Sequence, residues 1–351
     1  MNVNFLHSNK TKEYAIMKFK IEPSPHGNRA CEFSAANVGG FLPIIIGPTA
    51  SQKTRLAALV AHQLDGEIIS ADSRQVYRGM TIGTGKDLDD YIVRSVAIPH
   101  HLIDIRNAGE MYNVFEFQED FLQAYNDITQ RGKLPILCGG TGMYVEAIVK
   151  NYALHKVPED AQFRKQCEEK SFEELVAELK SYKTLHNSTD IDSKKRLIRA
   201  LEIARASTPL VAERSRSHST KREMQAPYTP IVIGIDVNRD VRRQRIEERF
   251  AKRLHQGMID EVKTLMAQGV TEEQLLYYGL EYKYTTLLIT GKITQQQFET
   301  ELLTAIFQFA KRQMTWFRGM ERRGIHIHWI DGEAVMEERV RAVIEIIINV
   351  S

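Results

Sequence analysis

Residues 42–54 read LPIIIGPTASQKT, an apolar run that leads directly into a glycine-containing loop and a Lys-Thr pair. Gly47, Lys53 and Thr54 have the spacing of the phosphate-binding pattern G-x-x-x-x-G-K-[ST], in which backbone N–H groups cradle phosphates. Gln52 stands where that pattern has its second glycine. The amphipathic sequence that follows predicts a helix, whose N-terminus adds further N–H donors. This stretch therefore predicts a strand, a phosphate-binding loop and a helix, with an ordinary strand–turn–helix as the alternative.

The side chains of this loop have distinct expected roles. Lys53 would reach a terminal phosphate as a point charge, and the Thr54 hydroxyl would bind a magnesium ion. Gln52 costs about 1–2 kcal/mol if the loop needs a left-handed residue there. We expect Gln52→Gly to tighten diphosphate binding by roughly 5–30-fold in that case, and by less if only crowding acts. The predicted phosphate site comprises Gly47, Pro48, Thr49, Ala50, Ser51, Gln52, Lys53 and Thr54.

Short apolar segments alternate with amphipathic ones along the chain. Strands are expected at 43–46, 67–70, 135–138, 231–236 and 325–330. Such alternation favours an α/β fold, here a P-loop parallel-sheet core with helices on both faces. The stretch between the second strand and the helix expected from residue 114, residues 72–113, is expected to be loop-rich.

Charged helical sequence interrupts this alternation between residues 157 and 226. It shows no clear strand, so we interpret residues 157–226 as an inserted helical domain. The core would then consist of residues 41–156 and 227–351. Residues 1–40 are polar and broken by prolines, which predicts a poorly ordered extension.

Charge and cysteine content limit the class of protein. The net charge is only +2, but residues 194–253 hold roughly sixteen Lys and Arg against seven Asp and Glu. Such a block favours a polyanion partner, although a solvated helix face would explain it equally well. Three scattered cysteines do not make a disulfide framework or a zinc site. With neither a signal-peptide core nor a membrane-spanning run, we expect a cytoplasmic protein without membrane contact, and a monomer.

Polar residues follow two further predicted strands. Asp72 comes just after the second strand, and Gly139, Gly140 and Thr141 follow the third. Ligands of parallel sheets bind beyond the carboxyl ends of the strands, so these residues should meet the phosphate loop. Asp72 could accept a proton or hold a metal through water, or it could simply cap a helix. The third strand ends in Cys138 rather than the magnesium-binding Asp of nucleotide hydrolases, which favours a transferase or a small-molecule kinase.

Several motifs in this order resemble the tRNA dimethylallyltransferase family. Beyond the loop they are ISADSRQVYRGM at 69–80, PHHLID at 99–104, GGTGMY at 139–144, RLIRALE at 196–202 and AKRQMTWFR at 310–318. The resemblance covers about residues 42–331. It implies transfer of a dimethylallyl group from dimethylallyl diphosphate to N6 of the adenosine 3′ to the anticodon of tRNA, with Mg²⁺ as cofactor.

The resemblance also implies roles for individual residues. Asp72 would match the general base, and Thr141 would bond the oxygen between the diphosphate and the allyl carbon. Lys53, magnesium on Thr54, and Arg199 or Arg196 would stabilise the departing diphosphate. The inserted helical domain would clamp the anticodon stem-loop. The implied tRNA-binding residues are Asp72, Ser73, Arg74, Gln75, Thr141, Arg164, Lys195, Arg196, Leu197, Ile198 and Arg199.

Two alternatives remain open from the sequence. One is an isopentenyltransferase that acts on free adenine nucleotides, against which the 157–226 insertion argues. The other is a tRNA-binding paralogue whose donor site is weakened by Gln52, against which the intact Lys53, Asp72 and Thr141 argue.

Overall fold

The computed structural model describes residues 40–154, 156–182, 191–216 and 226–350. The predicted N-terminal extension lies outside these residues, apart from Gly40. The strands are β1 (Phe41–Ile46), β2 (Gly66–Ser70), β3 (Ile92–Val93), β4 (Val96–Ala97), β5 (His100–His101), β6 (Leu134–Gly139), β7 (Thr229–Asp236) and β8 (Ile327–Asp331). The first helices are α1 (Lys53–Gln63), the 3₁₀ helix at Leu88–Tyr91, α2 (Val114–Gln130), α3 (Gly142–Val149), α4 (Ala161–Glu168), α5 (Phe172–Tyr182) and α6 (Lys194–Arg216). The later helices are α7 (Arg239–His255), α8 (Met258–Ala267), α9 (Glu272–Tyr277), α10 (Leu280–Ile289), α11 (Gln295–Arg322) and α12 (Met336–Val350).

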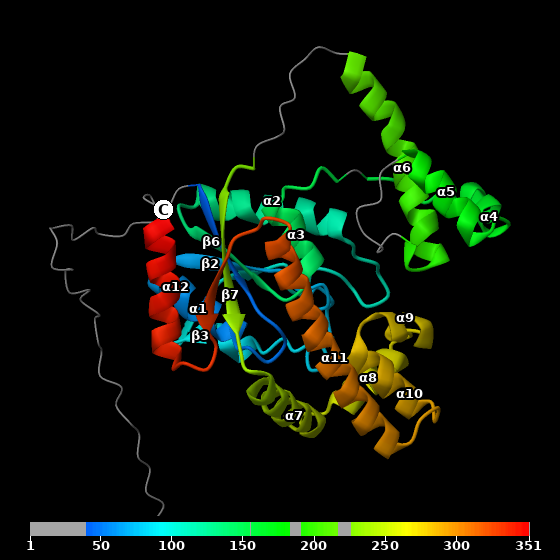
Figure 1. The fold of residues 1–351 in the computed structure, drawn as a ribbon. Helices are drawn as coiled ribbons and strands as arrows, with labels where there is room; N and C mark the ends of the chain where they lie inside the picture. The colour runs from blue at the N-terminus through cyan, green and yellow to red at the C-terminus, as the bar shows by residue number, and fades with distance from the viewer. Residues whose placement is uncertain (1–39, 155, 183–190, 217–225, 351) are drawn as a thin grey trace, which may run out of the picture. The chain divides into compact units, whose positions relative to one another are not determined.

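A six-stranded parallel sheet forms the centre of the core, in the order β5-β2-β6-β1-β7-β8 (Figure 1). Strand β1 lies between β6 and β7, with Ile44 opposite Leu137 and Val232. All residues of β2 and β6 are buried, as expected for strands covered on both faces. Because the strands are parallel, the loops after β1, β2 and β6 leave the same edge of the sheet.

Helices cover both faces of the sheet, as the sequence predicts. On one face α1 and α12 pack through Leu56 and Val343 against strand residues such as Ile45. On the other face α2, α3 and α11 contribute Phe117, Tyr144 and Phe317 to a second core. The expected α/β fold is thereby confirmed. None of the helices in the described ranges is both long and apolar enough to cross a lipid bilayer.

The stretch between β2 and α2 contains more structure than the sequence predicts. Strand β5 forms one edge of the sheet by pairing with Ile68 and Ile69 of β2, and β3 and β4 form a small antiparallel pair. The prediction missed β5 because it consists of His100 and His101, which lack the apolar character of the other strands. The element is short and takes its stability from pairing with β2 rather than from its own sequence.

Helices α4, α5 and α6 form a small core of their own. Phe163, Cys167, Leu175, Leu179 and Leu201 are buried in it. Between residues 157 and 216 the described part of the chain contains helices and no strand, in agreement with the sequence. The exact limits predicted for an inserted domain, 157 and 226, stay a prediction.

Candidate active site

The loop between β1 and α1 has the backbone shape of an anion-binding nest. Ala50 and Gln52 both adopt left-handed conformations, each with φ 62°. Alternation of left- and right-handed residues turns successive N–H groups toward one concave surface. Gln52 is also the N-cap residue of α1, and its side chain makes no capping bond to the helix. The first N–H groups of α1 are therefore open to an anion.

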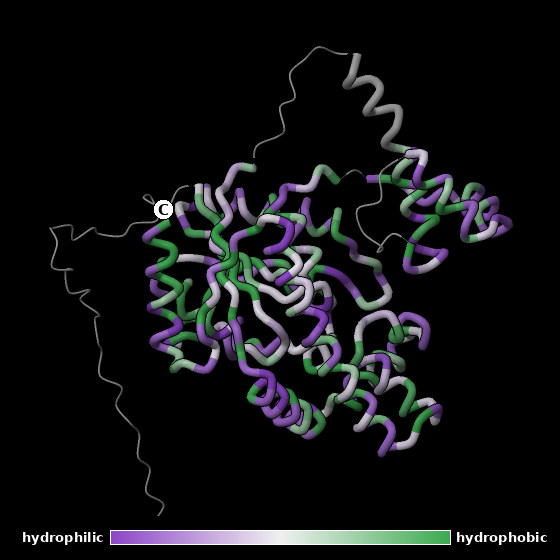
Figure 2. The backbone as a smooth tube through the Cα atoms, viewed as in Figure 1, coloured by the Kyte–Doolittle hydropathy of each residue, from purple (hydrophilic) through white to green (hydrophobic). Residues whose placement is uncertain are grey.

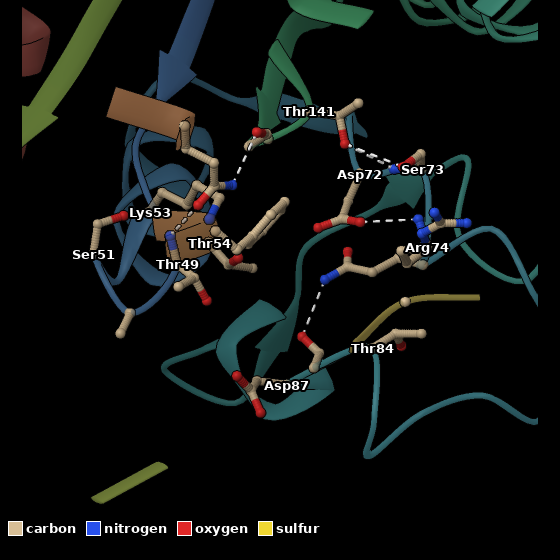
Figure 3. Close-up of a pocket in the computed structure, with 18 of the residues that line it drawn as sticks. Thr49, Ser51, Lys53, Thr54, Asp72, Ser73, Arg74, Thr84, Asp87 and Thr141 are labelled. Atoms are coloured by element: carbon tan, nitrogen blue, oxygen red, sulfur yellow. Dashed lines mark hydrogen bonds between the residues drawn. The ribbon is translucent and has the colours of Figure 1, made fainter. Parts of the chain in front are cut away.

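Three strand ends meet around one cavity of about 500 Å³, as the sequence predicts. This volume lies within the range of small-molecule sites. Its lining includes residues 49–54 after β1, 72–75 after β2, 138–142 after β6, and Arg249, Arg253, Arg312, Gln313 and Trp316 from α7 and α11. In Figure 3, Lys53 and Thr54 lie across the cavity from Asp72 and Ser73. The cavity thus brings cationic, hydroxyl and carboxylate groups together.

Lys53 lies in the cavity wall without a carboxylate partner among the described residues. Its Nζ donates to the Pro48 carbonyl oxygen at 3.4 Å. Burial lowers the pKa of Lys53; nearby Asp72 opposes that shift, and nearby Arg249 adds to it. A cation held in this way gains a counter-ion when a phosphate enters the cavity.

Arg249 is a cavity residue that the sequence did not predict. Its Nη2 donates to the hydroxyl of Thr49 in the loop. Burial, with a further contribution from Arg253, lowers the pKa of Arg249 to about 10. Arg253 lies one helical turn further along α7, 3.5 Å from Glu281 and 3.9 Å from Asp87. Helix α7 therefore places two guanidinium groups in the cavity wall beside Lys53.

Asp72 and Thr141 lie on loops that are tied to each other. The Oδ1 atom of Asp72 accepts the N–H of Arg74 at 2.9 Å, and the Thr141 hydroxyl accepts the N–H of Ser73 at 3.1 Å. The Asp72 bond is a local turn within the loop rather than the helix cap considered from the sequence, because no helix begins there. Both side chains line the cavity, and Figure 3 shows them on the side opposite Lys53.

Gln313 of α11 connects two of these loops. Its Oε1 accepts the N–H of Thr49 at 2.8 Å, and its Nε2 donates to the Gly140 carbonyl at 2.9 Å. A Cβ at Gly140 would lie 2.5 Å from this Nε2, so a side chain there would displace the Gln313 amide from its present position. The neighbouring Phe317 is fully buried in the core, whereas Trp316 lines the cavity and meets Gly142.

Glu261 of α8 fixes another part of the wall. Its carboxylate accepts the N–H groups of Thr81, Ile82 and Gly83 at 2.8, 2.7 and 3.0 Å, and the hydroxyl of Tyr282 at 2.6 Å. These bonds hold the 81–85 loop, to which the Gln75 amide donates at 3.0 Å. No local sequence signal indicated this role, because Glu261 and the loop N–H group of Thr81 lie 180 residues apart in the chain.

Comparison with known proteins shows which family this chain is similar to. A family described as IPP transferase matches residues 75–320. The chain is 54% identical over 302 residues to tRNA dimethylallyltransferase 2 of Bacteroides fragilis, covering 85% of this chain and 95% of that protein. It is 52% identical over 305 residues to tRNA dimethylallyltransferase 1 of Parabacteroides distasonis, covering 87% and 97%. The solved tRNA isopentenylpyrophosphate transferase of Bacillus halodurans has 31% identity and a TM-score of 0.63, over 88% of this chain and 96% of that one.

The chain belongs to the tRNA dimethylallyltransferase family. It is therefore a prenyltransferase, as the resemblance in its motifs implied. The family assignment does not favour either alternative that the sequence left open.

Three of the basic residues that the resemblance pointed to in α4 and α6, Arg164, Arg196 and Arg199, are engaged in ion pairs. Glu202 is 4% exposed and accepts from Arg164 at 2.8 and 2.9 Å and from Arg199 at 2.8 Å. Burial alone would raise the pKa of Glu202, but the two guanidinium groups lower it to about 2. Arg199 also donates to the Val157 carbonyl at 2.8 Å and is not among the residues that line the cavity. The structure thus does not bring Arg199 to the predicted diphosphate site.

The run 195–199 divides into two faces of α6. Leu197 and Ile198 are buried in the small helical core, where their side chains pack within the protein, and a contact of these two residues with tRNA stays a prediction. Lys195 and Arg196 are exposed, and Arg196 pairs with Asp192 at 2.7 Å. A helix alternates its faces every few residues, so a continuous motif cannot present all its side chains to one partner.

The cavity suits a metal that arrives with a phosphate ligand. The Thr54 hydroxyl and the carboxylates of Asp72, Asp87 and Asp90 line it. The described residues contain no cluster of three or more metal-ligating side chains. Magnesium is commonly held by one or two protein oxygens together with substrate phosphates, and these residues fit that arrangement.

Proposed function

We propose that this chain transfers the dimethylallyl group of dimethylallyl diphosphate to N6 of the adenosine 3′ to the anticodon of tRNA. The observation that carries the proposal is the cavity in which an anion-binding loop, the Asp72 carboxylate and a Lys53 with no carboxylate partner in the described part of the chain face one another. Family membership supports the same reaction. The donor diphosphate would occupy the loop formed by residues 47–54.

The cations of the cavity would stabilise the leaving group. As N6 attacks the allylic carbon, the bond from that carbon to the diphosphate oxygen breaks and negative charge grows on the diphosphate. Lys53 and Arg249 would meet this charge, and the Thr141 hydroxyl would bond the bridging oxygen. Fixed donors in a site shielded from water are effective for this purpose because they need no reorganisation. We assign Arg249 the role that the sequence gave to Arg199.

Asp72 would accept the proton that N6 loses. Its Oδ1 is held by the Arg74 N–H, which orients the carboxylate at the cavity. A carboxylate within hydrogen-bond reach of the nucleophile can act as a general base. Magnesium bound at Thr54 would neutralise part of the diphosphate charge.

RNA would reach the cavity through residues at its rim and through the helical insertion. The adenosine must leave its stack to meet the donor, and splayed bases of RNA loops are the usual targets of such enzymes. We propose that Ser73, Arg74 and Gln75 contact the anticodon loop at the cavity. The exposed Lys195 and Arg196 would contact phosphates of the anticodon stem-loop, with 157–226 as the tRNA-binding insertion in a cytoplasmic, monomeric enzyme.

A transfer assay tests the proposal. Purified protein, magnesium and dimethylallyl diphosphate are incubated with an anticodon stem-loop RNA, and nucleosides are analysed by mass spectrometry. We expect N6-dimethylallyladenosine at the single adenosine 3′ to the anticodon, and none when guanosine replaces it. Product on free AMP but not on the RNA would favour the nucleotide-modifying alternative. RNA binding without any product would favour the paralogue with a weakened donor site.

A further inference from the structure

Gln52 occupies a strained position in the donor loop. Its backbone is left-handed, with φ 62° and ψ 26°, a conformation that disfavours any residue with a Cβ. The structure therefore meets the condition under which glycine is the better residue. What the sequence did not predict is where the glutamine side chain goes.

The Gln52 amide reaches away from the cavity to α12. Its Oε1 accepts a hydrogen bond from Nη2 of Arg339 at 2.8 Å. Arg339 is not among the residues that line the cavity. Gln52 itself borders the cavity, but its amide is engaged with α12, which limits the crowding of a diphosphate expected from the sequence.

Arg339 depends on this bond. It is 5% exposed, and its Nε and Nη1 have no partner among the described residues. It lies in the first turn of α12, where the positive end of the helix dipole disfavours a cation. Burial lowers the pKa of Arg339, and the nearby Arg245 adds to this shift. Without the glutamine, the guanidinium would be a buried cation with no side-chain acceptor in the described chain.

We propose that Arg339 is a positioning residue for the donor loop. By holding the Gln52 side chain against α12, it keeps residue 52 left-handed and the N–H nest open although position 52 is not glycine. The two residues then act as a pair that replaces the second glycine of the loop pattern. The inference rests on the proposed function only in that it takes this loop as the binding site of the diphosphate.

A double-mutant cycle tests the pair. Wild type, Gln52→Gly, Arg339→Met and the double variant are compared by titration with inorganic pyrophosphate and magnesium, which requires neither tRNA nor transfer. We expect Arg339→Met to weaken pyrophosphate binding about fivefold and to raise the donor KM similarly, with kcat at saturating donor nearly unchanged. In the Gln52→Gly background the same substitution should have little effect, a coupling of about fivefold, or ~1 kcal/mol.

The same cycle revises the expected effect of Gln52→Gly alone. Relief of backbone strain is offset by the unpartnered Arg339, so the affinity of Gln52→Gly should stay near that of wild type, and adding Arg339→Met should change it little. Arg339→Lys, which keeps the charge and a donor, should recover most of the affinity. Arg341→Met, at an exposed arginine of the same helix, is the matched control and should leave binding unchanged.

Each contrary result has a distinct meaning. An equal loss from Arg339→Met in both backgrounds would show that Arg339 acts by its charge and not through Gln52, and would overturn the pair. Unchanged binding in Arg339→Met would do the same. If wild type bound no pyrophosphate, the assignment of this loop as the diphosphate-binding site would be wrong. In that case coupling in the melting temperatures of the four proteins would still measure whether the two side chains depend on each other.

Discussion

The cavity at the carboxyl edge of the sheet and the helical insertion both contain partly buried arginines, but these arginines have different partners. Arg249 donates to the hydroxyl of Thr49 and has no carboxylate partner among the described residues. Arg164 and Arg199 both donate to the buried carboxylate of Glu202. A cation that lacks a counter-ion in the folded chain favours an anionic ligand, whereas a cation paired with a buried carboxylate already contributes to the fold. Residue type alone therefore does not separate binding arginines from structural ones.

The largest effect is expected at the carboxylate of the cavity. Asp72→Asn keeps the size of the side chain but removes the proton acceptor, so transfer should fall by roughly 100-fold or more, the scale of a general base. tRNA binding should be retained. Single-turnover transfer with saturating donor and RNA measures the effect, and Asp89→Asn, at an exposed residue outside the cavity lining, is the control. Transfer close to wild type would remove Asp72 from the proposed mechanism.

The buried carboxylate of the helical insertion should matter for stability instead. Glu202→Gln removes the carboxylate that Arg164 and Arg199 share and leaves Arg164 with only the exposed Glu159, so the insertion should lose about 1–3 kcal/mol of stability, the scale of hydrogen bonds to a charged group. Limited proteolysis should cleave the insertion faster, while pyrophosphate binding by the core stays unchanged. Glu168→Gln, at an exposed glutamate of the same insertion, should not change the cleavage rate. Weakened pyrophosphate binding in Glu202→Gln would mean that the ion pairs of the insertion also affect the cavity.

The pH dependence of the insertion follows from the same ion pairs. The pKa of Glu202 is lowered to about 2 in the folded chain. A carboxyl group with a depressed pKa stabilises the fold above its unfolded pKa, and this contribution is lost as the pH falls toward the folded value. The proteolysis difference between wild type and Glu202→Gln should therefore shrink between about pH 4.5 and pH 2. An acid-stable protease can measure it, and a constant difference across this window would contradict the assignment.

A smaller effect is expected at Arg249. Arg249→Met removes a guanidinium group from the cavity. The negative charge that develops on the diphosphate in the transition state then loses a fixed hydrogen-bond donor, so kcat/KM for dimethylallyl diphosphate should fall about 30-fold or more. The matched variant is Arg199→Met, which should leave the donor KM unchanged because Arg199 contacts Glu202 and Val157 instead. If Arg199→Met raised the donor KM as much as Arg249→Met, the sequence-based assignment would be right and the comparison above would fail.

The sequence predicted the features that are local in the chain. The loop at 47–54, Asp72 and Thr141 follow apolar strands, and parallel pairing alone brings these strand ends together. The burial of Leu197 and Ile198 also follows from helical spacing, although the motif itself is one continuous run. The two faces of a helix place the side chains of such a motif in different surroundings.

Arg249 and Arg339 could not be predicted in this way. Arg249 lies 200 residues from Thr49, in the charged helix α7, which is mostly purple in Figure 2 and reads from sequence as a solvated element. Arg339 lies 287 residues from Gln52. Only the packing of α7 and α12 beside the loop gives these side chains their partners. Long-range contacts of this kind have no periodic signature in a single sequence.

The smallest effect is expected on the exposed face of α6. Lys195 and Arg196 are the residues of the 195–199 run that remain available to RNA, so Lys195→Ala with Arg196→Ala should weaken binding of the anticodon stem-loop. Each lost phosphate contact should reduce the slope of log affinity against log salt by about 0.7–0.9. The reduction expected for the pair is therefore up to about 1.8, with the melting temperature unchanged because both side chains are exposed. Arg199→Met should differ in kind, because it removes a partner of Glu202 and lowers stability without a matching change in slope.

An unchanged slope in the double alanine variant would show that this face of α6 is solvated and that RNA is bound elsewhere. A slope lost only with Arg199 would instead mean that the Glu202 pair opens when RNA binds.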